Sequence, residues 1–109
     1  MQVIDGKDIT ISRGDTLDVI FRVSGLSFTD GDKAIFSIKS DYVLKPIYTC
    51  ECTLRGNVVG VLVPADVMAT IDVGEYKYDI VVTIVATGKV ITLFATSFFT
   101  VEEVAHNVG

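Results

Sequence analysis

The amino-acid sequence predicts an all-β fold in which two sheets stack as a sandwich. Stretches that alternate apolar and polar residues recur roughly every 8–12 residues, and clusters of Gly, Asp and Asn separate them, as in sandwiches and barrels. The apolar residues are rich in Val, Ile, Phe and Tyr, which suit a pleated, half-buried surface. A length of 109 residues favours one domain. We therefore expect about seven to eight antiparallel strands in residues 1–101, followed by a short tail over residues 102–109.

The first strands follow from the apolar spacing near the amino terminus. Residues 3–4 lead into a turn at residues 5–8, and residues 9–11 form a short segment that we expect at the edge of a sheet. The turn at residues 13–15 precedes the first long alternating stretch, residues 16–23. One apolar face on this stretch predicts a half-buried strand.

The middle of the chain contains a loop and two further strands. The loop, residues 24–33, includes Leu26 and Phe28, which we expect to fold back over an open end of the core. Residues 34–39 alternate again. Pro46 restricts where the next strand can begin, because proline has no N–H to donate to a β-ladder. The apolar face of that next strand consists of Tyr48, Cys50, Cys52 and Leu54.

The chain then changes from strand to a short helical turn. A turn at residues 55–57 joins the previous strand to an apolar strand over residues 58–63. Residues 64–71 form the one plausible helical turn, with Val67 and Ile71 on one side. It is too short to be stable alone, and we expect it to carry the chain from one sheet to the other.

Two long strands close the sequence. Residues 76–84 alternate regularly, and a turn at residues 87–89 leads into the last strand, residues 90–101. The alternation of this last strand slips between Ala95 and Phe98, which predicts a β-bulge or burial on both faces.

The charge pattern argues against binding to nucleic acid or insertion into a membrane. The net charge is −5, and the nine Lys and Arg residues are spread along the chain, whereas phosphate binding needs them clustered. No apolar run reaches the roughly 18 residues that a membrane-spanning helix requires. The start of the chain lacks a basic segment followed by an apolar one, so either the protein is not exported by that route or a leader has been removed.

Cys50 and Cys52 are the only cysteines in the chain. Two positions apart on a strand, their side chains run parallel and do not converge on a disulfide. We expect two reduced thiols, which suits assembly in a bacterial cytoplasm. Metal binding by this pair is a remote alternative because further ligands are missing.

No group of residues in the sequence predicts catalysis or a cofactor. His106, the only histidine, lies in the tail, where no triad can be built around it. The carboxylate pairs at residues 102–103 and 30–32 have no apolar surroundings that would shift their pKa values for acid–base work. A calcium site at Asp30-Gly31-Asp32 is the weaker alternative to a solvated loop, since Ca²⁺ needs about six oxygens or more. We expect a protein that is not an enzyme.

Arg13-Gly14-Asp15 matches the tripeptide of integrin ligands, but it falls where a turn must occur. Gly14 supplies the backbone freedom that the turn requires, and Asp15 can close the turn through its carboxylate. We therefore adopt the structural interpretation of this tripeptide.

Residues 72–78 say most about the type of sandwich. In immunoglobulin-like sandwiches, a Tyr near the start of the sixth strand donates a hydrogen bond to upstream backbone and fixes the corner between the sheets. Tyr76 fits this position, and Gly74 would ease the close approach. Tyr78 stands where an antibody domain has its second disulfide cysteine. These residues predict an immunoglobulin-like β-sandwich, the alternative being two ordinary strand tyrosines.

Three segments carry a family resemblance: residues 9–16, residues 74–80 and the final residues 98–101, which end a hairpin through Gly88. Together they resemble the immunoglobulin-like domains of phage tail and baseplate proteins, notably the amino-terminal domain of upper baseplate proteins. The resemblance spans residues 3–101. It implies a part of a virion that docks onto other tail or baseplate proteins in several copies, and it brings no catalytic residues.

Two functions are expected from these features. The first is a non-enzymatic structural and assembly module of a bacteriophage or prophage tail or baseplate, assembled in the host cytoplasm and acting by protein–protein packing. Apolar residues on outward strand faces favour it, because such residues often mark an interface. These residues are Ile20, Val81, Val85 and Phe94.

The alternative is an exported bacterial surface adhesion or carbohydrate-binding sandwich. In that case loops would carry the ligand contacts, and Phe28, Tyr42 and Tyr48 would stack on sugars.

Overall fold

The computed structural model describes residues 2–5, 7–40 and 46–103 of the chain. These residues form nine strands and one short helix. The elements in chain order are β1 (Gln2–Asp5), β2 (Asp8–Ser12), β3 (Leu17–Arg22), β4 (Lys33–Lys39), β5 (Tyr48–Glu51), β6 (Thr53–Arg55), β7 (Val58–Val63), α1 (Ala65–Met68), β8 (Gly74–Ile84) and β9 (Lys89–Glu102).

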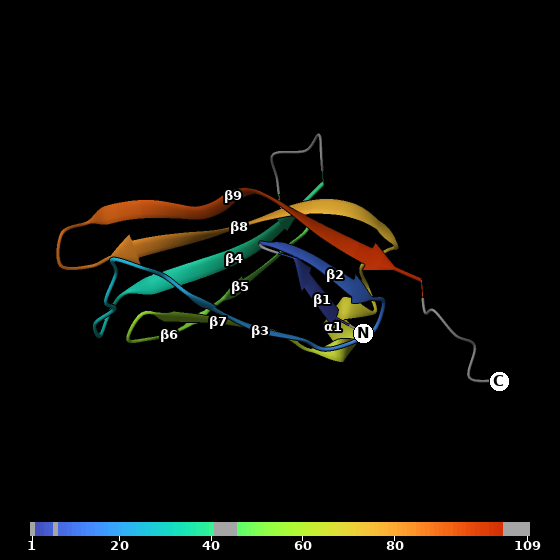
Figure 1. Cartoon of the computed structure of the whole chain (residues 1–109), viewed down its shortest axis with the longest axis horizontal. Coiled ribbons are helices and arrows are strands. Elements are labelled where there is room, and N and C mark those ends of the chain that lie inside the picture. The colour runs from blue at the N-terminus through green and yellow to red at the C-terminus, as the bar shows by residue number, and fades with distance from the viewer. Residues whose placement is uncertain (1, 6, 41–45, 104–109) are drawn as a thin grey trace.

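The strands form two layers, as Figure 1 shows. The larger sheet has six strands in the order β1-β2-β9-β8-β4-β5, and the smaller sheet has three in the order β3-β7-β6. The predicted all-β sandwich is thus confirmed, with nine described strands in place of the seven to eight expected. Its finer assignment as immunoglobulin-like stays a prediction.

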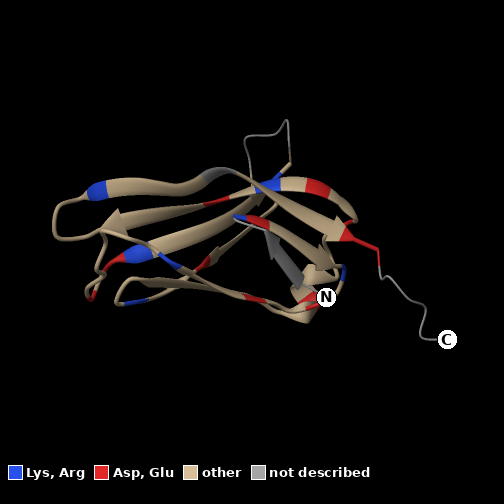
Figure 2. Ribbon diagram, viewed as in Figure 1, with Lys and Arg blue, Asp and Glu red and all other residues tan. Residues whose placement is uncertain are grey.

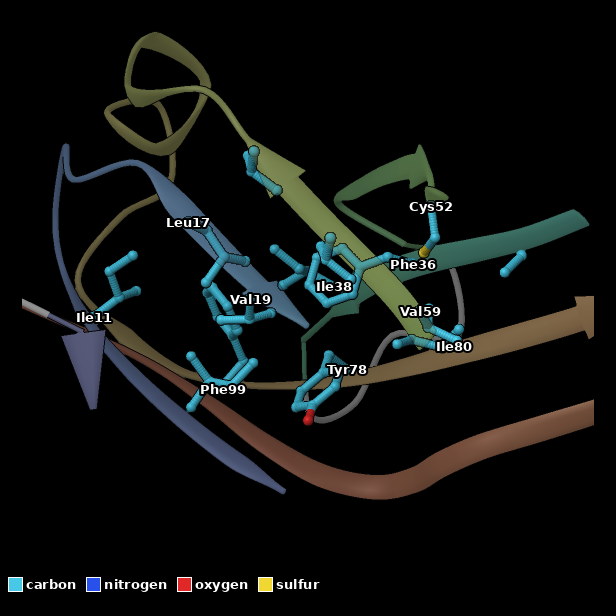
Figure 3. Packing of buried hydrophobic residues seen from close by; sticks show 14 of the residues in the cluster. Ile11, Leu17, Val19, Phe36, Ile38, Cys52, Val59, Tyr78, Ile80 and Phe99 are labelled. Atoms are coloured by element: carbon cyan, nitrogen blue, oxygen red, sulfur yellow. The ribbon is translucent and has the colours of Figure 1, made fainter. Parts of the chain in front are cut away.

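The core lies between the two sheets and is built by the alternation along each strand. On β3, Leu17 and Val19 are buried, whereas Ile20, on the opposite face of the strand, points outward and is exposed. From the larger sheet, Phe36 and Phe99 meet them inside the sandwich (Figure 3). Burying a side chain of this size stabilises the fold by about 1.5–3 kcal/mol. The period-two pattern therefore sets which face each strand turns inward.

β2 is an interior strand, so the edge position expected from the sequence is wrong. It pairs antiparallel with β1 and parallel with β9, and its side chains Ile9 and Ile11 are fully buried. The expectation of purely antiparallel strands is also wrong for this one pair. Alternation records which face is buried, whereas the direction of a neighbouring strand depends on how distant segments meet.

The single strand predicted over residues 48–54 is two strands in different sheets. β5 pairs with β4 in the larger sheet, whereas β6 pairs with β7 in the smaller sheet. Between them, the Cys52 N–H donates to the Ala34 carbonyl at 2.8 Å. Because all side chains of the segment keep one phase, the sequence pattern does not reveal that the chain crosses over.

The two ends of the core are closed as the sequence predicts. At one end, α1 carries the chain from β7 in the smaller sheet to β8 in the larger one. Met68 of α1 and Ile71, which follows the helix, are buried in the core. In the loop between β3 and β4, Phe28 is buried and its N–H donates to the Gly56 carbonyl at 2.7 Å. Leu26 packs beside it against the core.

β9 contains the predicted bulge. Tyr78 pairs with Ser97 and Ile80 pairs with Leu93, so residues 94–96 of β9 lie opposite residue 79 of β8 alone. Leu93 and Ser97 keep one phase across this interruption, and the irregular alternation in the sequence falls on the residues between them.

Phe94 faces the core, so its predicted outward position is wrong. Its backbone has a φ of 57°, a left-handed conformation that a bulky residue rarely adopts. This conformation turns the ring toward Phe21, with 4.7 Å between the ring centroids. Phe98, four residues further along β9, is exposed on the outer face.

Candidate interaction surfaces

Tyr76 ties the start of β8 to the segment that follows α1. Its hydroxyl donates to the backbone carbonyl of Asp72 at 2.6 Å. Partial burial raises the pKa of Tyr76, and the nearby Asp72 carboxylate adds to this effect. The contact has the form that the corner-tyrosine prediction describes, a hydroxyl bonded to backbone a few residues upstream.

Gly74 lies at the start of β8, ahead of Tyr76. A Cβ added at this position would lie 3.8 Å from the nearest atoms of the Tyr76 ring, which is an ordinary van der Waals contact. Its backbone is not among the left-handed glycines. The close approach of Tyr76 therefore does not require glycine, contrary to the role expected for Gly74.

Arg13-Gly14-Asp15 forms the turn between β2 and β3. Gly14 has a φ of 85°, and the Asp15 N–H donates to the Ser12 carbonyl at 3.1 Å. The Arg13 guanidinium donates to the Ala69 carbonyl, at 3.3 Å from Nε and 3.2 Å from Nη2. This contact joins the turn to the end of α1, and sequence reasoning missed it because the two residues are far apart in the chain.

Tyr78 occupies the middle of the core (Figure 3). Its ring lies 5.5 Å from that of Phe36 and 6.3 Å from that of Phe99, and its hydroxyl donates to the Lys7 carbonyl. Burial raises the pKa of Tyr78 to about 12, although a hydrogen bond with Ser97 acts in the opposite direction. A phenol of this kind stays neutral near pH 7, so Tyr78 contributes through packing and through this hydrogen bond.

Cys50 and Cys52 are free thiols, as expected. Burial raises the pKa of Cys50, and it raises the pKa of Cys52 to about 12. Nucleophilic cysteines need the opposite shift, because the thiolate is the reactive form. Among the residues that the structure describes, no three His, Cys, Asp or Glu side chains gather as a metal site requires.

The Asp32 carboxylate binds backbone N–H groups in its own loop and just after the end of β8. Its carboxylate accepts hydrogen bonds from the Thr29 N–H at 2.9 Å and from the Val85 N–H at 3.0 Å. These two bonds lower the pKa of Asp32. Asp30 is exposed. The carboxylate considered for calcium thus fastens the loop to the sheet.

Of the three aromatic residues considered for sugar stacking, the two that the structure describes are not exposed. Phe28 is buried, and Tyr48 is half-buried with its ring packed against the core. Tyr42 lies outside the described residues, as does His106. The rings of Phe28 and Tyr48 are therefore engaged inside the domain.

The outer face of the larger sheet carries polar side chains as well as exposed apolar ones such as Ile35. Lys39 Nζ lies 2.8 Å from Asp79 Oδ2, and Asp79 is largely buried. Lys77 Nζ lies 5.9 Å from the ring centroid of exposed Phe98. Figure 2 shows charged residues of both signs spread over the ribbon.

Among the described residues, the four large apolar side chains that are more than half exposed fall in two regions. On the outer face of the smaller sheet, Ile20 is 63% and Leu62 is 59% exposed. Near the hairpin between β8 and β9, Val85 is 58% and Val90 is 62% exposed. The outward positions predicted for Ile20 and Val85 are confirmed. Leu62 was not foreseen because β7 is apolar on both phases, so alternation gives no signal there.

β3 leaves one edge of the smaller sheet open. The Val23 N–H donates to the Asn57 carbonyl at 2.8 Å and continues the ladder between β3 and β7. Because hydrogen-bonded positions alternate along an antiparallel strand, the N–H and C=O groups of Asp18, Ile20 and Arg22 point away from β7. No described strand pairs with β3 on that side. We call these three residues the open edge of β3.

Comparisons with protein-family models, with curated proteins and with solved structures find no match. The phage-tail resemblance of the sequence therefore stays a prediction. Within the described ranges, no helix is long and apolar enough to cross a membrane.

Proposed function

We propose that this protein is a non-enzymatic structural and assembly module of a bacteriophage or prophage tail or baseplate, acting by packing against other proteins. The exposed pair Ile20 and Leu62 carries the packing part of this proposal. Ile20 lies opposite Gly60 and Leu62 lies opposite Asp18, so the two apolar side chains are diagonal neighbours on one face. Clustered apolar side chains left in water favour association with a partner surface.

The strand order supports the immunoglobulin-like part of the proposal. The run β9-β8-β4-β5 corresponds to the G-F-C-C′ order of a variable-type domain, and β3-β7-β6 corresponds to its B-E-D order. Tyr76, at the start of the strand that corresponds to F, makes the hydrogen bond expected of the corner tyrosine.

The position of the resembling segments supports the virion part. Residues 9–16, 74–80 and 98–101 fall on or beside β2, β8 and β9, which are neighbours in the larger sheet. The free thiols of Cys50 and Cys52 are in keeping with assembly in a reducing host cytoplasm.

Mass spectrometry of purified tail particles from the source strain tests the virion role. We expect peptides of this chain at a fixed ratio to the other tail proteins, and their absence from particles would contradict the proposal.

The packing role is tested by incorporation of variants into these particles. Leu62→Asp should fold but be incorporated several-fold less than the wild type, because it places a charge on the exposed apolar face. Thr83→Asp, an exposed position on the other sheet, serves as the matched control. Equal incorporation of Leu62→Asp and the wild type would mean that the exposed face of the smaller sheet does not pack against other tail proteins.

A further inference from the structure

We propose that the open edge of β3 is a dimer interface, at which a second copy of this chain pairs antiparallel with the first and Ile20 meets Ile20. The inference goes beyond the proposed function and holds whether or not the protein is a virion component. Three independent features of β3 lead to it: its backbone, its charges and its apolar centre.

The backbone of β3 has the geometry that self-pairing needs. The N–H and C=O groups of Asp18, Ile20 and Arg22 point away from β7. When two copies of β3 run antiparallel about Ile20, these same residues meet one another as hydrogen-bonded pairs. The ladder between β3 and β7 runs without a register shift, so the edge is regular over its whole length. Regular, uncovered edges are the sites where strands add to a sheet.

The charges of β3 are complementary to themselves in this register. Asp18 and Arg22 are exposed and lie two positions on either side of Ile20. In the antiparallel pair, Asp18 of each copy lies directly opposite Arg22 of the other, and opposite charges in this position are attractive. Asp18 also has an interaction within its own chain, so its pairing with Arg22 of the second copy does not depend on its being without a partner. A shift of the register by two residues loses both charge pairs, so the charges select one alignment.

The apolar centre of the interface is Ile20, which is 63% exposed in the single chain. In the dimer, Ile20 of each copy covers the other, and Leu62 lies on the adjacent strand beside Asp18. The result is one continuous sheet made from the β6-β7-β3 sheets of both copies. A two-fold axis through Ile20 closes this assembly, because each copy offers the same surface to the other.

The other open strands lack these features. β5 borders the larger sheet and turns Thr49 and Glu51 outward, so an antiparallel self-pair there brings no opposite charges together. β6 is only three residues long, and β1, at the other border of the larger sheet, is four residues long and has no basic residue to pair with Asp5. Among these edges of the described residues, β3 therefore fits a second copy best.

Charge reversal with the full chain, followed by sedimentation velocity, tests the pairing. Wild type should dimerise, and Asp18→Arg or Arg22→Asp alone should weaken dimerisation about tenfold or more, because each change makes two attractive pairs repulsive. The double variant should dimerise again. An equimolar mixture of the two single variants should form a heterodimer, which also shows that each variant is folded. Glu51→Arg, an equivalent reversal on β5, should leave the wild-type dimer intact.

Three results would overturn the inference. They are a wild-type monomer at concentrations up to about 1 mM, self-association that both single reversals leave unchanged, and self-association that only Glu51→Arg abolishes. These outcomes are separate from the particle analysis above. A protein absent from tail particles can still dimerise through β3, and a virion component can still fail the charge reversal.

Discussion

The Tyr76 hydroxyl and the Arg13 guanidinium both reach backbone carbonyls in the segment after α1. Tyr76 donates to Asp72, and Arg13 donates to Ala69. Arg13 also lies 3.9 Å from the Asp72 carboxylate, but both side chains are well exposed. Exposed ion pairs contribute little, so the bonds to the carbonyls contribute more than this ion pair to holding the segment after α1 in place.

Replacing Tyr76 with Phe should lower the free energy of unfolding by about 1 kcal/mol, because it removes one hydrogen bond to the backbone and keeps the ring. Urea denaturation measures the change. Tyr48→Phe is the control, since it removes a hydroxyl that lies beside the Cys50 thiol. An equal loss in both variants would mean that the Asp72 contact has no special role.

The two glycines considered from the sequence should differ in their response to alanine. Gly14→Ala should destabilise the fold by about 1–2 kcal/mol, because its φ of 85° is left-handed. Gly74→Ala should be close to neutral, since the added Cβ meets only the Tyr76 ring at 3.8 Å. Thermal melts of both variants provide the comparison, and a larger loss at Gly74 would contradict it.

Asp32 should make stability depend on pH in the acid range. Its pKa is lowered from 3.8 by hydrogen bonds from the Thr29 and Val85 N–H groups. The stabilisation is therefore present above the unfolded pKa and is lost as pH falls through the folded one. Asp32→Asn should melt below the wild type near pH 7, and the gap should narrow below about pH 4. A gap that does not change with pH, or one that Asp30→Asn reproduces, would argue against this role.

For the strands, the sequence predicts which face of each strand is buried better than it predicts which strands lie next to each other. The alternation of β3 gave its buried face, because apolar side chains on one phase must leave water. The parallel contact of β2 with β9 and the crossover at Cys52 depend on which distant backbone groups meet, and local pattern carries no record of that choice.

The candidate interface was predictable only in part. Ile20 stood out as an apolar residue on the polar face of its strand, and the structure confirms that its side chain is exposed. The opposite charges of Asp18 and Arg22 were visible too, but their meaning required knowing that β3 ends a sheet. At β9 the slip in alternation indicated the bulge, whereas the inward turn of Phe94 follows from its backbone conformation.

For the whole molecule, we expect stability to fall at alkaline pH. Burial raises the pKa of Tyr78 from 10.0 and that of Cys52 from 9.0, each to about 12. Because the folded pKa values exceed the unfolded ones, the stabilisation is full below about pH 9 and is lost as pH rises toward 12. Chemical denaturation at stepped pH measures it. The fall should be smaller in Tyr78→Phe, and a stability independent of pH in this range would contradict the burial of both groups.

The central claim is that a sandwich with an open β3 edge works by packing, and amide hydrogen exchange along β3 tests it most directly. In dilute solution, the amides of Val19 and Phe21 should exchange slowly because they are bonded to β7, while those of Ile20 and Arg22 exchange quickly. At high concentration the Ile20 and Arg22 amides should become protected as well. Exchange that shows no alternation along β3, or no change with concentration, would contradict the account.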